Sequence, residues 1–120
     1  MKYKGTLIVV KDCKKALEFY HDMFGLMLIT DNDGNMELSG NIFLQEENYW
    51  QQFTGRKPIP ENVHTELYFE EPEIEAFVKK LEENYPETVF VNHLMTHSWG
   101  QTVVRFFDPD GNLIEVGTPV

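Results

Sequence analysis

The chain has 120 residues, and 20 acidic against 10 basic side chains give it a formal net charge of −10 at pH 7. This length is enough for one domain with its own core, and the acidic excess argues against binding to nucleic acid or to anionic lipid, both of which attract basic surfaces. The only cysteine, Cys13, excludes an internal disulfide. With no signal peptide or membrane-length apolar run, these features predict a cytoplasmic protein.

The first half of the chain predicts a strand, a helix and three further strands. Residues 6–10 form a β-branched apolar run, which is typical of a strand. Asp12 is placed to cap the following helix, and Gly25 to end it. Apolar residues recur between them at helical spacing. The three further strands are expected at residues 26–30, 36–38 and 42–45.

Residues 46–62 form the longest segment in which no periodic pattern is found, and we expect it to be irregular. It contains Tyr49, Trp50 and Phe53 together with two prolines. A segment of this kind is either a connection with local packing or a lid over a pocket.

The second half repeats the same order of elements. A strand is expected at residues 64–69, and a helix follows, opened by Glu71-Pro72-Glu73 and ended by Tyr85-Pro86. Three more strands are expected at residues 88–91, 103–107 and 113–116. His93 and His97 are expected in a loop before the closing pair. Two four-stranded units, each too small to be stable alone, are expected to pair.

The last predicted strand carries one charge in an apolar setting. Asp108-Pro109-Asp110-Gly111 is a turn sequence, and the run after it holds Glu115 between Ile114 and Val116. A carboxylate inside a buried strand is costly unless it has a partner. Glu115 is therefore the first indication of a functional site.

Taken together, residues 9–12, 16–20, 24–26, 99–101 and 108–115 resemble the vicinal oxygen chelate superfamily, which includes glyoxalase I, bleomycin-resistance proteins and extradiol dioxygenases. The resemblance covers essentially the whole chain. It implies an α+β fold of two paired βαβββ modules, which form a cupped mixed sheet with the helices on its convex side. It also implies a site in the concave cavity, and a homodimer.

On this resemblance, residues 1–120 form a single domain. Module one spans about residues 1–46, a connecting segment spans 47–62, and module two spans 63–120. The modules are expected to pair either within one chain or between two chains.

The resemblance also implies candidate metal ligands on the first and last strands of each module. In module two these positions hold His64 and Glu115, whereas their counterparts in module one are Gly5 and Leu44, which cannot bind a metal. Two ligands are fewer than the three that catalytic divalent sites usually have. Glu66, two residues after His64, is the candidate for a third ligand or for a catalytic proton carrier, and a second chain is another source of ligands. The alternative is a hydrogen-bonded polar cluster without metal.

Two hypotheses for function follow. The first is a small-molecule-binding protein of the glyoxalase/bleomycin-resistance type, in which an aromatic or cationic ligand is held without a metal by aromatic walls and carboxylates. The candidate ligand-binding residues are Trp50, Phe53, Tyr68 and Trp99. The second is a metal-dependent lyase, isomerase or dioxygenase, with zinc, nickel, manganese or iron held by His64 and Glu115.

Overall fold

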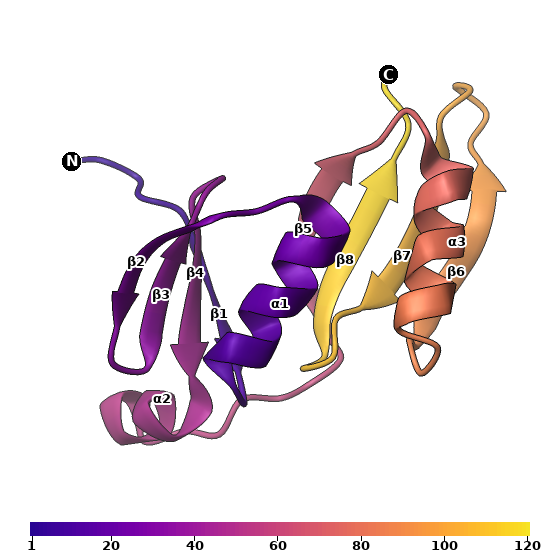
Figure 1. Ribbon diagram of the computed structural model, residues 1–120. Coiled ribbons are helices and arrows are strands. Elements are labelled where there is room, and N and C mark those ends of the chain that lie inside the picture. Colours follow the sequence, from indigo (N-terminus) through magenta and orange to yellow (C-terminus); the bar gives the residue numbers. More distant parts are fainter. The chain divides into compact units, whose positions relative to one another are not determined.

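The computed structural model covers residues 1–120 and shows the βαβββ order twice (Figure 1), so the predicted α+β fold of two such modules is confirmed. The first module consists of β1 (Thr6–Val10), α1 (Cys13–Phe24), β2 (Leu28–Asn32), β3 (Asn35–Leu38) and β4 (Ile42–Glu46). A further helix, α2 (Glu47–Thr54), follows it. The second consists of β5 (Asn62–Glu70), α3 (Ile74–Asn84), β6 (Phe90–Thr96), β7 (Thr102–Phe107) and β8 (Asn112–Gly117). The chain divides into two compact units, Met1–Pro58 and Ile59–Val120.

Helix α1 begins and ends at the predicted residues. The side chain of Asp12 accepts hydrogen bonds from the backbone nitrogens of Lys14 and Lys15, at 3.0 and 3.2 Å. Gly25 ends the helix with a φ of 68°, a left-handed conformation that glycine adopts without steric cost. The two caps therefore explain why the helix occupies these twelve residues.

The first unit has a four-stranded sheet in the order β1-β4-β3-β2, with α1 over one of its faces (Figure 1). Strand β1 runs parallel to β4, and the other neighbours are antiparallel. The core between the sheet and α1 is apolar: Ile8, Val10, Ala16, Phe19, Tyr20, Met23, Met36, Leu38, Ile42 and Leu44.

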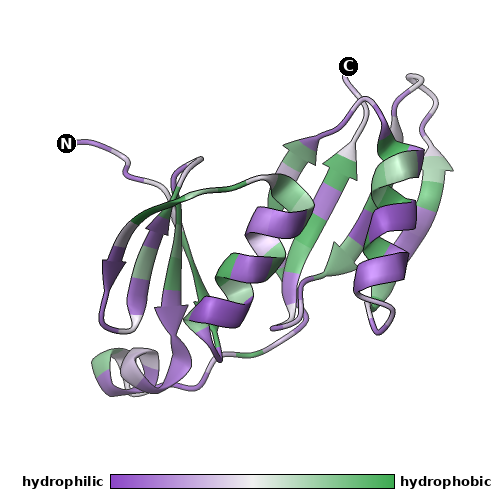
Figure 2. Ribbon diagram, in the orientation of Figure 1, coloured by the Kyte–Doolittle hydropathy of each residue, from purple (hydrophilic) through white to green (hydrophobic).

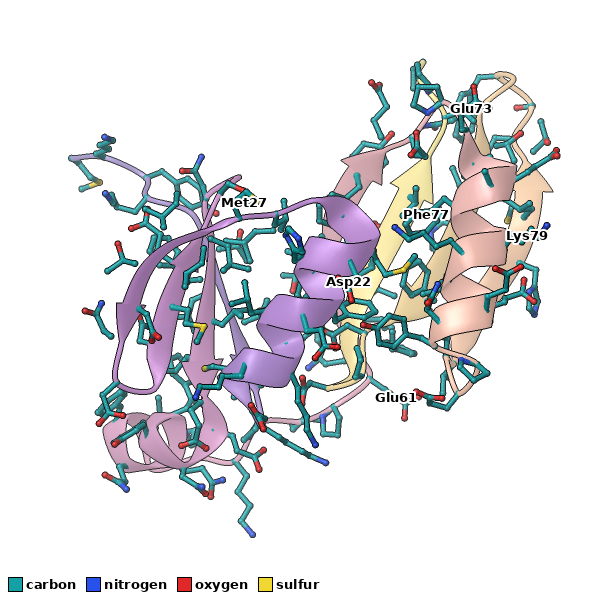
Figure 3. All side chains as sticks on the ribbon, in the orientation of Figure 1. Asp22, Met27, Glu61, Glu73, Phe77 and Lys79 are labelled. Atoms are coloured by element: carbon teal, nitrogen blue, oxygen red, sulfur yellow. The ribbon has the colours of Figure 1, made fainter.

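The second unit has a four-stranded sheet in the corresponding order β5-β8-β7-β6, and α3 packs on one face. Phe77 on α3 faces this sheet, where its ring lies 6.1 Å from that of Phe106, whereas Lys79 points the other way (Figure 3). Both α1 and α3 carry hydrophilic and hydrophobic residues side by side, as amphipathic helices do (Figure 2). One face of each sheet is therefore used for the core, which leaves the other face for function.

Two sequence predictions about local structure were wrong. Residues 46–62 are not all irregular, because α2 occupies Glu47–Thr54, with Glu46 as its N-cap and Gly55 at its end. The helix has only eight residues, none of them buried, so the helical spacing of Tyr49, Trp50 and Phe53 was too short a pattern to predict it. Strand β6 extends to Thr96, which places His93 in a strand rather than in a loop.

None of the helices is both long enough and apolar enough to cross a membrane.

Candidate functional site

Strand β8 presents Glu115 on the sheet face opposite α3. Its neighbours Ile114 and Val116 are buried, at 0% and 1% exposure. Side chains alternate along a strand, so Glu115 points away from that core. The carboxylate is thus not trapped in the core, which resolves the conflict seen in the sequence.

Arg105 is the partner of Glu115. The two residues lie opposite each other on β7 and β8, and Arg105 Nε donates to Glu115 Oε1 at 2.7 Å. Their side chains are 27% and 13% exposed, so this ion pair is screened by solvent much less than a surface pair is. Arg105 also donates from Nη1 to Asn92 Oδ1 on β6, at 3.0 Å. Sequence reasoning missed Arg105, although it interrupts the apolar run 103–107 as Glu115 interrupts the next strand.

Glu66 on β5 adds a second carboxyl group beside Glu115. Burial raises the pKa of Glu66 above its ordinary value, and the charge of Glu115 and a side-chain hydrogen bond with it raise this pKa further. The positive charge of Arg105 lowers the pKa of Glu66, but the net shift of this pKa is upward. Two carboxyl groups therefore face one guanidinium group, and a proton on Glu66 relieves their repulsion.

A second set of hydrogen bonds joins two exposed aromatic rings. Gln101 is buried, at 6% exposure, and its Nε2 donates to Tyr68 Oη at 2.6 Å and to the Thr118 carbonyl oxygen at 3.0 Å. Trp99 Nε1 donates to Gln101 Oε1 at 3.2 Å. The Trp99 ring also stacks on His97, with centroids 4.2 Å apart and planes 13° apart. The rings are thus fixed in orientation while they remain 55% (Tyr68) and 64% (Trp99) exposed.

Gly117 creates the space that Gln101 occupies. A Cβ atom at residue 117 would lie 2.7 Å from Gln101 Nε2 and 3.3 Å from a Val103 methyl group. Because these contacts are closer than van der Waals packing allows, any larger residue here would displace Gln101. Sequence reasoning missed Gln101, as it missed Arg105. The available signal was Gly117, a glycine at the end of an apolar strand, where it indicates that another group approaches the backbone closely.

These groups form one cluster, which we call the polar site. It consists of Glu66, Tyr68, Trp99, Gln101, Arg105 and Glu115, all in the unit Ile59–Val120. Its centre is a row of residues across the sheet, because the strand register sets Tyr68 beside Glu115, Glu115 beside Arg105, and Arg105 beside Asn92. Of the residues predicted from the sequence, the structure brings together Glu66, Tyr68 and Glu115 directly, and Trp99 through Gln101.

The other two predicted ligand-binding residues belong to the first unit. Trp50 and Phe53 lie on α2, where Phe53 is 68% exposed and its ring stacks on Tyr49 with a centroid distance of 6.2 Å. Tyr49 in turn donates from its hydroxyl group to Asp33 at 3.0 Å, a bond that raises the pKa of Tyr49. Within its unit α2 thus contacts the β2–β3 turn through Tyr49, and it also lies against β4 and β1. The role of Trp50 and Phe53 in ligand binding stays a prediction.

The residues do not fit the metal site that the resemblance implied. Tyr68, not His64, lies opposite Glu115 on β5, and His64 lies four residues earlier, where the register between β5 and β8 shifts. The Glu115 carboxylate is also engaged by Arg105. Nowhere in the chain do three or more His, Cys, Asp or Glu side chains gather closely enough to hold a metal ion. Two candidate ligands, one of them bonded to Arg105, are fewer than a catalytic divalent site usually has, and a metal held by His64 and Glu115 stays a prediction.

Leu44, the module-one counterpart of Glu115 chosen from the sequence, is fully buried on the α1 side, beside its β1 partner Ile8, whereas Glu115 faces away from its helix. On β4 the residues that alternate with buried Ile42 and Leu44 are Phe43 and Gln45. Neither has an acidic group, so this face of β4 has no equivalent of the Glu115 carboxylate.

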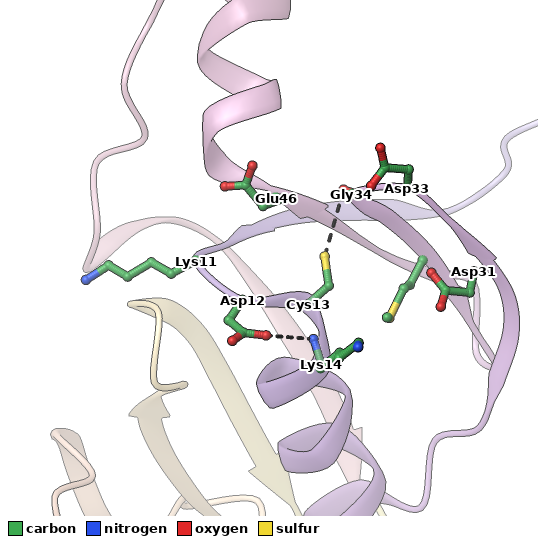
Figure 4. Close-up of a pocket in the computed structure, with 9 residues that line it drawn as sticks. Lys11, Asp12, Cys13, Lys14, Asp31, Asp33, Gly34 and Glu46 are labelled. Carbon is green, nitrogen blue, oxygen red and sulfur yellow. Dashed lines mark hydrogen bonds between the residues drawn. The ribbon is translucent and has the colours of Figure 1, made fainter.

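A separate pocket of about 570 Å³ lies in the first unit, between the starts of α1 and α2 and the β2–β3 turn (Figure 4). Three of its four acidic groups serve the fold: Asp12 and Glu46 cap the two helices, and Asp33 accepts the bond from Tyr49. Cys13 Sγ lies 3.8 Å from the Gly34 carbonyl oxygen and donates to it. This arrangement agrees with a structural role for Cys13, so the polar site is the better candidate for function.

We expect the protein purified without chelator to contain far less than one zinc, nickel, manganese or iron ion per chain. The reason is that Glu115 is bonded to Arg105 and that no cluster of three or more ligand side chains surrounds it. Elemental analysis by mass spectrometry measures this directly. One equivalent of metal that disappears in a His64→Ala variant would contradict the expectation.

The comparisons with known proteins point to one family. The family model described as a glyoxalase-like domain matches residues 3–120. No curated protein matches the sequence. A protein of unknown function from Agrobacterium tumefaciens is similar at 25% identity and a TM-score of 0.81, with 100% of this chain and 95% of that chain covered.

Two further solved structures carry family names. A member of the glyoxalase/bleomycin resistance protein/dioxygenase superfamily from Sphaerobacter thermophilus is similar at 24% identity and a TM-score of 0.73, with coverage of 99% and 98%. A lactoylglutathione lyase from Agrobacterium tumefaciens is similar at 20% identity and a TM-score of 0.71, with coverage of 98% and 92%. At these identities the similarity shows the fold. With the family model matching almost its entire length, the chain belongs to the glyoxalase-like family, within the vicinal oxygen chelate superfamily.

Proposed function

We propose that this protein is a small-molecule-binding protein of the glyoxalase/bleomycin-resistance type, and that it binds an aromatic cation at the polar site without a metal. The observation that carries the proposal is the pairing of two carboxyl groups, Glu66 and Glu115, with one guanidinium group, Arg105. When both acids are ionised the cluster has a net charge of about −1, which a monocation neutralises.

The direction of the Glu66 pKa shift supports a cationic ligand. Because the pKa is raised by burial and by Glu115, the empty site tends to keep a proton that a cation would displace. Binding of a cation lowers this pKa, so affinity should rise with pH until Glu66 is ionised in the empty protein. Above that pH the affinity should no longer change through this group.

The aromatic rings support a flat ligand. Tyr68 lies beside Glu115 in the sheet, and the Gln101 side chain links Tyr68 to Trp99. A cation over an aromatic face gains about 0.5–2 kcal/mol, depending on how dry the site is. Rings that are already fixed lose little conformational entropy on binding, which favours affinity.

The test is isothermal titration calorimetry at pH 8 with N-methylacridinium, a permanent planar cation, and with acridine, its neutral counterpart. We expect the cation to bind at least about tenfold more tightly than acridine, since 1.4 kcal/mol of charge attraction is tenfold in affinity. Titration in buffers of different ionisation enthalpy near pH 5 should show net release of protons by the protein when the cation binds.

Matched variants separate this site from general attraction to an acidic protein. Glu66→Gln and Glu115→Gln should each remove most of the preference for the cation. Glu82→Gln, an exposed change on α3, has the same effect on net charge and should leave the preference intact. Equal binding of both probes, or equal losses in all three variants, would contradict the proposal.

The alternative is a metal-dependent lyase, isomerase or dioxygenase in which Glu66 moves a proton. The raised pKa of Glu66 is the observation in its favour, because a proton carrier works best when its pKa lies near the working pH. The arrangement of His64 and Glu115 weighs against it. The single cysteine is compatible with a reducing compartment, so we expect either activity to take place in the cytoplasm.

A further inference from the structure

The side-chain amide of Gln101 has only one possible orientation in the polar site. The oxygen and the NH₂ group of an amide have nearly the same shape, so their partners decide which atom lies where. The indole N–H of Trp99 can only donate, and it lies 3.2 Å from Gln101 Oε1. The carbonyl oxygen of Thr118 can only accept, and it lies 3.0 Å from Gln101 Nε2. Exchange of the two amide atoms would break both bonds, so the orientation is fixed from both sides.

This orientation determines the direction of a third hydrogen bond, the one to Tyr68. The Gln101 NH₂ group has two hydrogens and accepts nothing, and its second hydrogen goes to Tyr68 Oη at 2.6 Å. The Tyr68 oxygen is therefore the acceptor of this bond. The hydrogen of the Tyr68 hydroxyl group must consequently point to something other than Gln101.

The Tyr68 hydroxyl group thus keeps a donor for a partner outside the protein. The bond from Gln101 is the hydrogen bond that the structure gives to this group, and Tyr68 is half exposed, so water accepts from it in the empty protein. Tyr68 lies beside Glu115 in the sheet, which places its ring where a ligand of the carboxylates would cover it. A donor that is covered without a new acceptor loses its bond to water, which lowers the affinity.

Trp99 offers a ligand no comparable donor. Its single N–H group is used by Gln101, and one face of its ring is covered by His97, with centroids 4.2 Å apart. The rest of the ring is available for stacking, which needs no hydrogen bond. Tyr68 and Trp99 therefore differ in what they offer, although the same glutamine side chain holds both.

We infer that the aromatic cation bound at the polar site carries a hydrogen-bond acceptor, such as a carbonyl oxygen, which takes the hydroxyl hydrogen of Tyr68. The inference rests on the proposed function and adds a chemical requirement to it. Gln101 is a positioning residue, because its fixed NH₂ group decides the direction in which Tyr68 donates. A site built to donate a hydrogen bond discriminates against analogues that lack the acceptor.

Isothermal titration calorimetry at pH 8 with a matched pair of N-methylquinolinium ions tests this requirement. One ion carries an acetyl group, either meta or para to the ring nitrogen. The other carries an isopropenyl group at the same position, so that a CH₂ group replaces the carbonyl oxygen while shape and charge are kept. In at least one of the two positions we expect the acetyl ion to bind about three- to tenfold more tightly, the range for one neutral hydrogen bond.

Two variants locate the donor. Tyr68→Phe keeps the ring but removes the hydroxyl group, so it should abolish the preference for the acetyl ion. Gln101→Glu should abolish it too, although Tyr68 is still present. The new carboxyl group has at most one proton, which the Thr118 carbonyl oxygen requires, so Tyr68 must donate to residue 101 instead. The added negative charge acts on both ions alike and cancels in the ratio of their affinities.

Tyr3→Phe is the matched control. Tyr3 is exposed, belongs to the other unit, and shares a hydrogen bond with Thr6, so its loss should leave the preference unchanged. Circular dichroism and thermal unfolding check that each variant is folded.

The outcomes separate this inference from the proposed function. Equal affinities for the acetyl and isopropenyl ions in both positions, a preference that survives in Tyr68→Phe or Gln101→Glu, or an equal loss in Tyr3→Phe would each overturn the inference. Binding of N-methylacridinium that depends on Glu66 and Glu115 would still support the proposed function in those cases. A native protein that binds none of these cations would overturn both.

Discussion

An Asp108→Ala variant is expected to lose about 3 kcal/mol of unfolding free energy, because it removes a buried charged acceptor of three hydrogen bonds. Asp108 is 4% exposed. Its carboxylate accepts from the backbone nitrogens of Asp110 and Asn112, at 2.9 and 2.8 Å, and from Asn112 Nδ2 at 2.9 Å. Alanine leaves these donors without an acceptor inside the β7–β8 turn. Guanidinium unfolding followed by circular dichroism measures the loss.

Asp108→Asn is the matched comparison for this prediction. Asparagine keeps one oxygen for the two backbone donors but presents an NH₂ group to Asn112 Nδ2. We therefore expect a smaller loss, of about 1 kcal/mol. If Asp108→Ala costs less than Asp108→Asn, the three hydrogen bonds do not hold the turn as described. The turn matters for function because it sets the register that brings Arg105 opposite Glu115.

Replacement of Arg105 by methionine is expected to destabilise the protein by about 2 kcal/mol at pH 8, somewhat less than the 3–5 kcal/mol for breaking a fully buried ion pair. Methionine retains much of the side-chain volume but leaves Glu66 and Glu115 without a cation. With Arg105 gone, the effect that lowers the pKa of Glu66 is lost, so this pKa rises further.

The pH dependence of this loss identifies its cause. A carboxyl group whose pKa is raised in the folded state costs no stability below its unfolded pKa, and its cost grows as pH rises through the folded pKa. The difference between native and Arg105→Met proteins should therefore be larger at pH 8 than at pH 5. Arg105→Lys, which keeps the charge, should recover part of the stability at pH 8. A loss that is the same at both pH values would mean that only packing was removed.

The Arg105→Met variant also tests ligand binding. Without Arg105 the ionised cluster carries one more negative charge, so the affinity for N-methylacridinium at pH 8 should rise, by about tenfold for a gain of 1.4 kcal/mol. The neutral acridine should be little affected. An unchanged affinity for the cation would show that the charge of the cluster does not determine what binds.

Strands and caps were the most predictable part of this protein, because their signals are local. Strand β1 and the caps Asp12 and Gly25 lie where their residue types predicted them. Helix α2 was not predictable in the same way, since none of its residues is buried and its cap, Glu46, is an uncommon one. The Glu46 carboxylate accepts hydrogen bonds from the backbone nitrogens of Asn48 and Tyr49, and Tyr49 contacts the turn that contains Gly34.

The site was only partly predictable, because alternation gives the face of a side chain but not its neighbours. Glu115 was recognised as an acid in an apolar run, and its direction followed from Ile114 and Val116. Arg105 lies three residues before Asp108 and Glu115 four residues after Gly111, so it is the strand register, not the count from the turn, that pairs them. The irregular register between β5 and β8, which falls between Asn62 and Leu67, could not be predicted from alternation either.

The row of Tyr68, Glu115, Arg105 and Asn92 has a consequence for the ligand that we propose. Adjacent strands lie about 4.8 Å apart, a spacing fixed by backbone hydrogen bonds rather than by side chains. The sheet therefore holds the backbone positions of an aromatic residue, Tyr68, and an anionic residue, Glu115, one strand spacing apart. Exchange of a single residue in the row would change the chemistry at that position without moving the neighbouring positions.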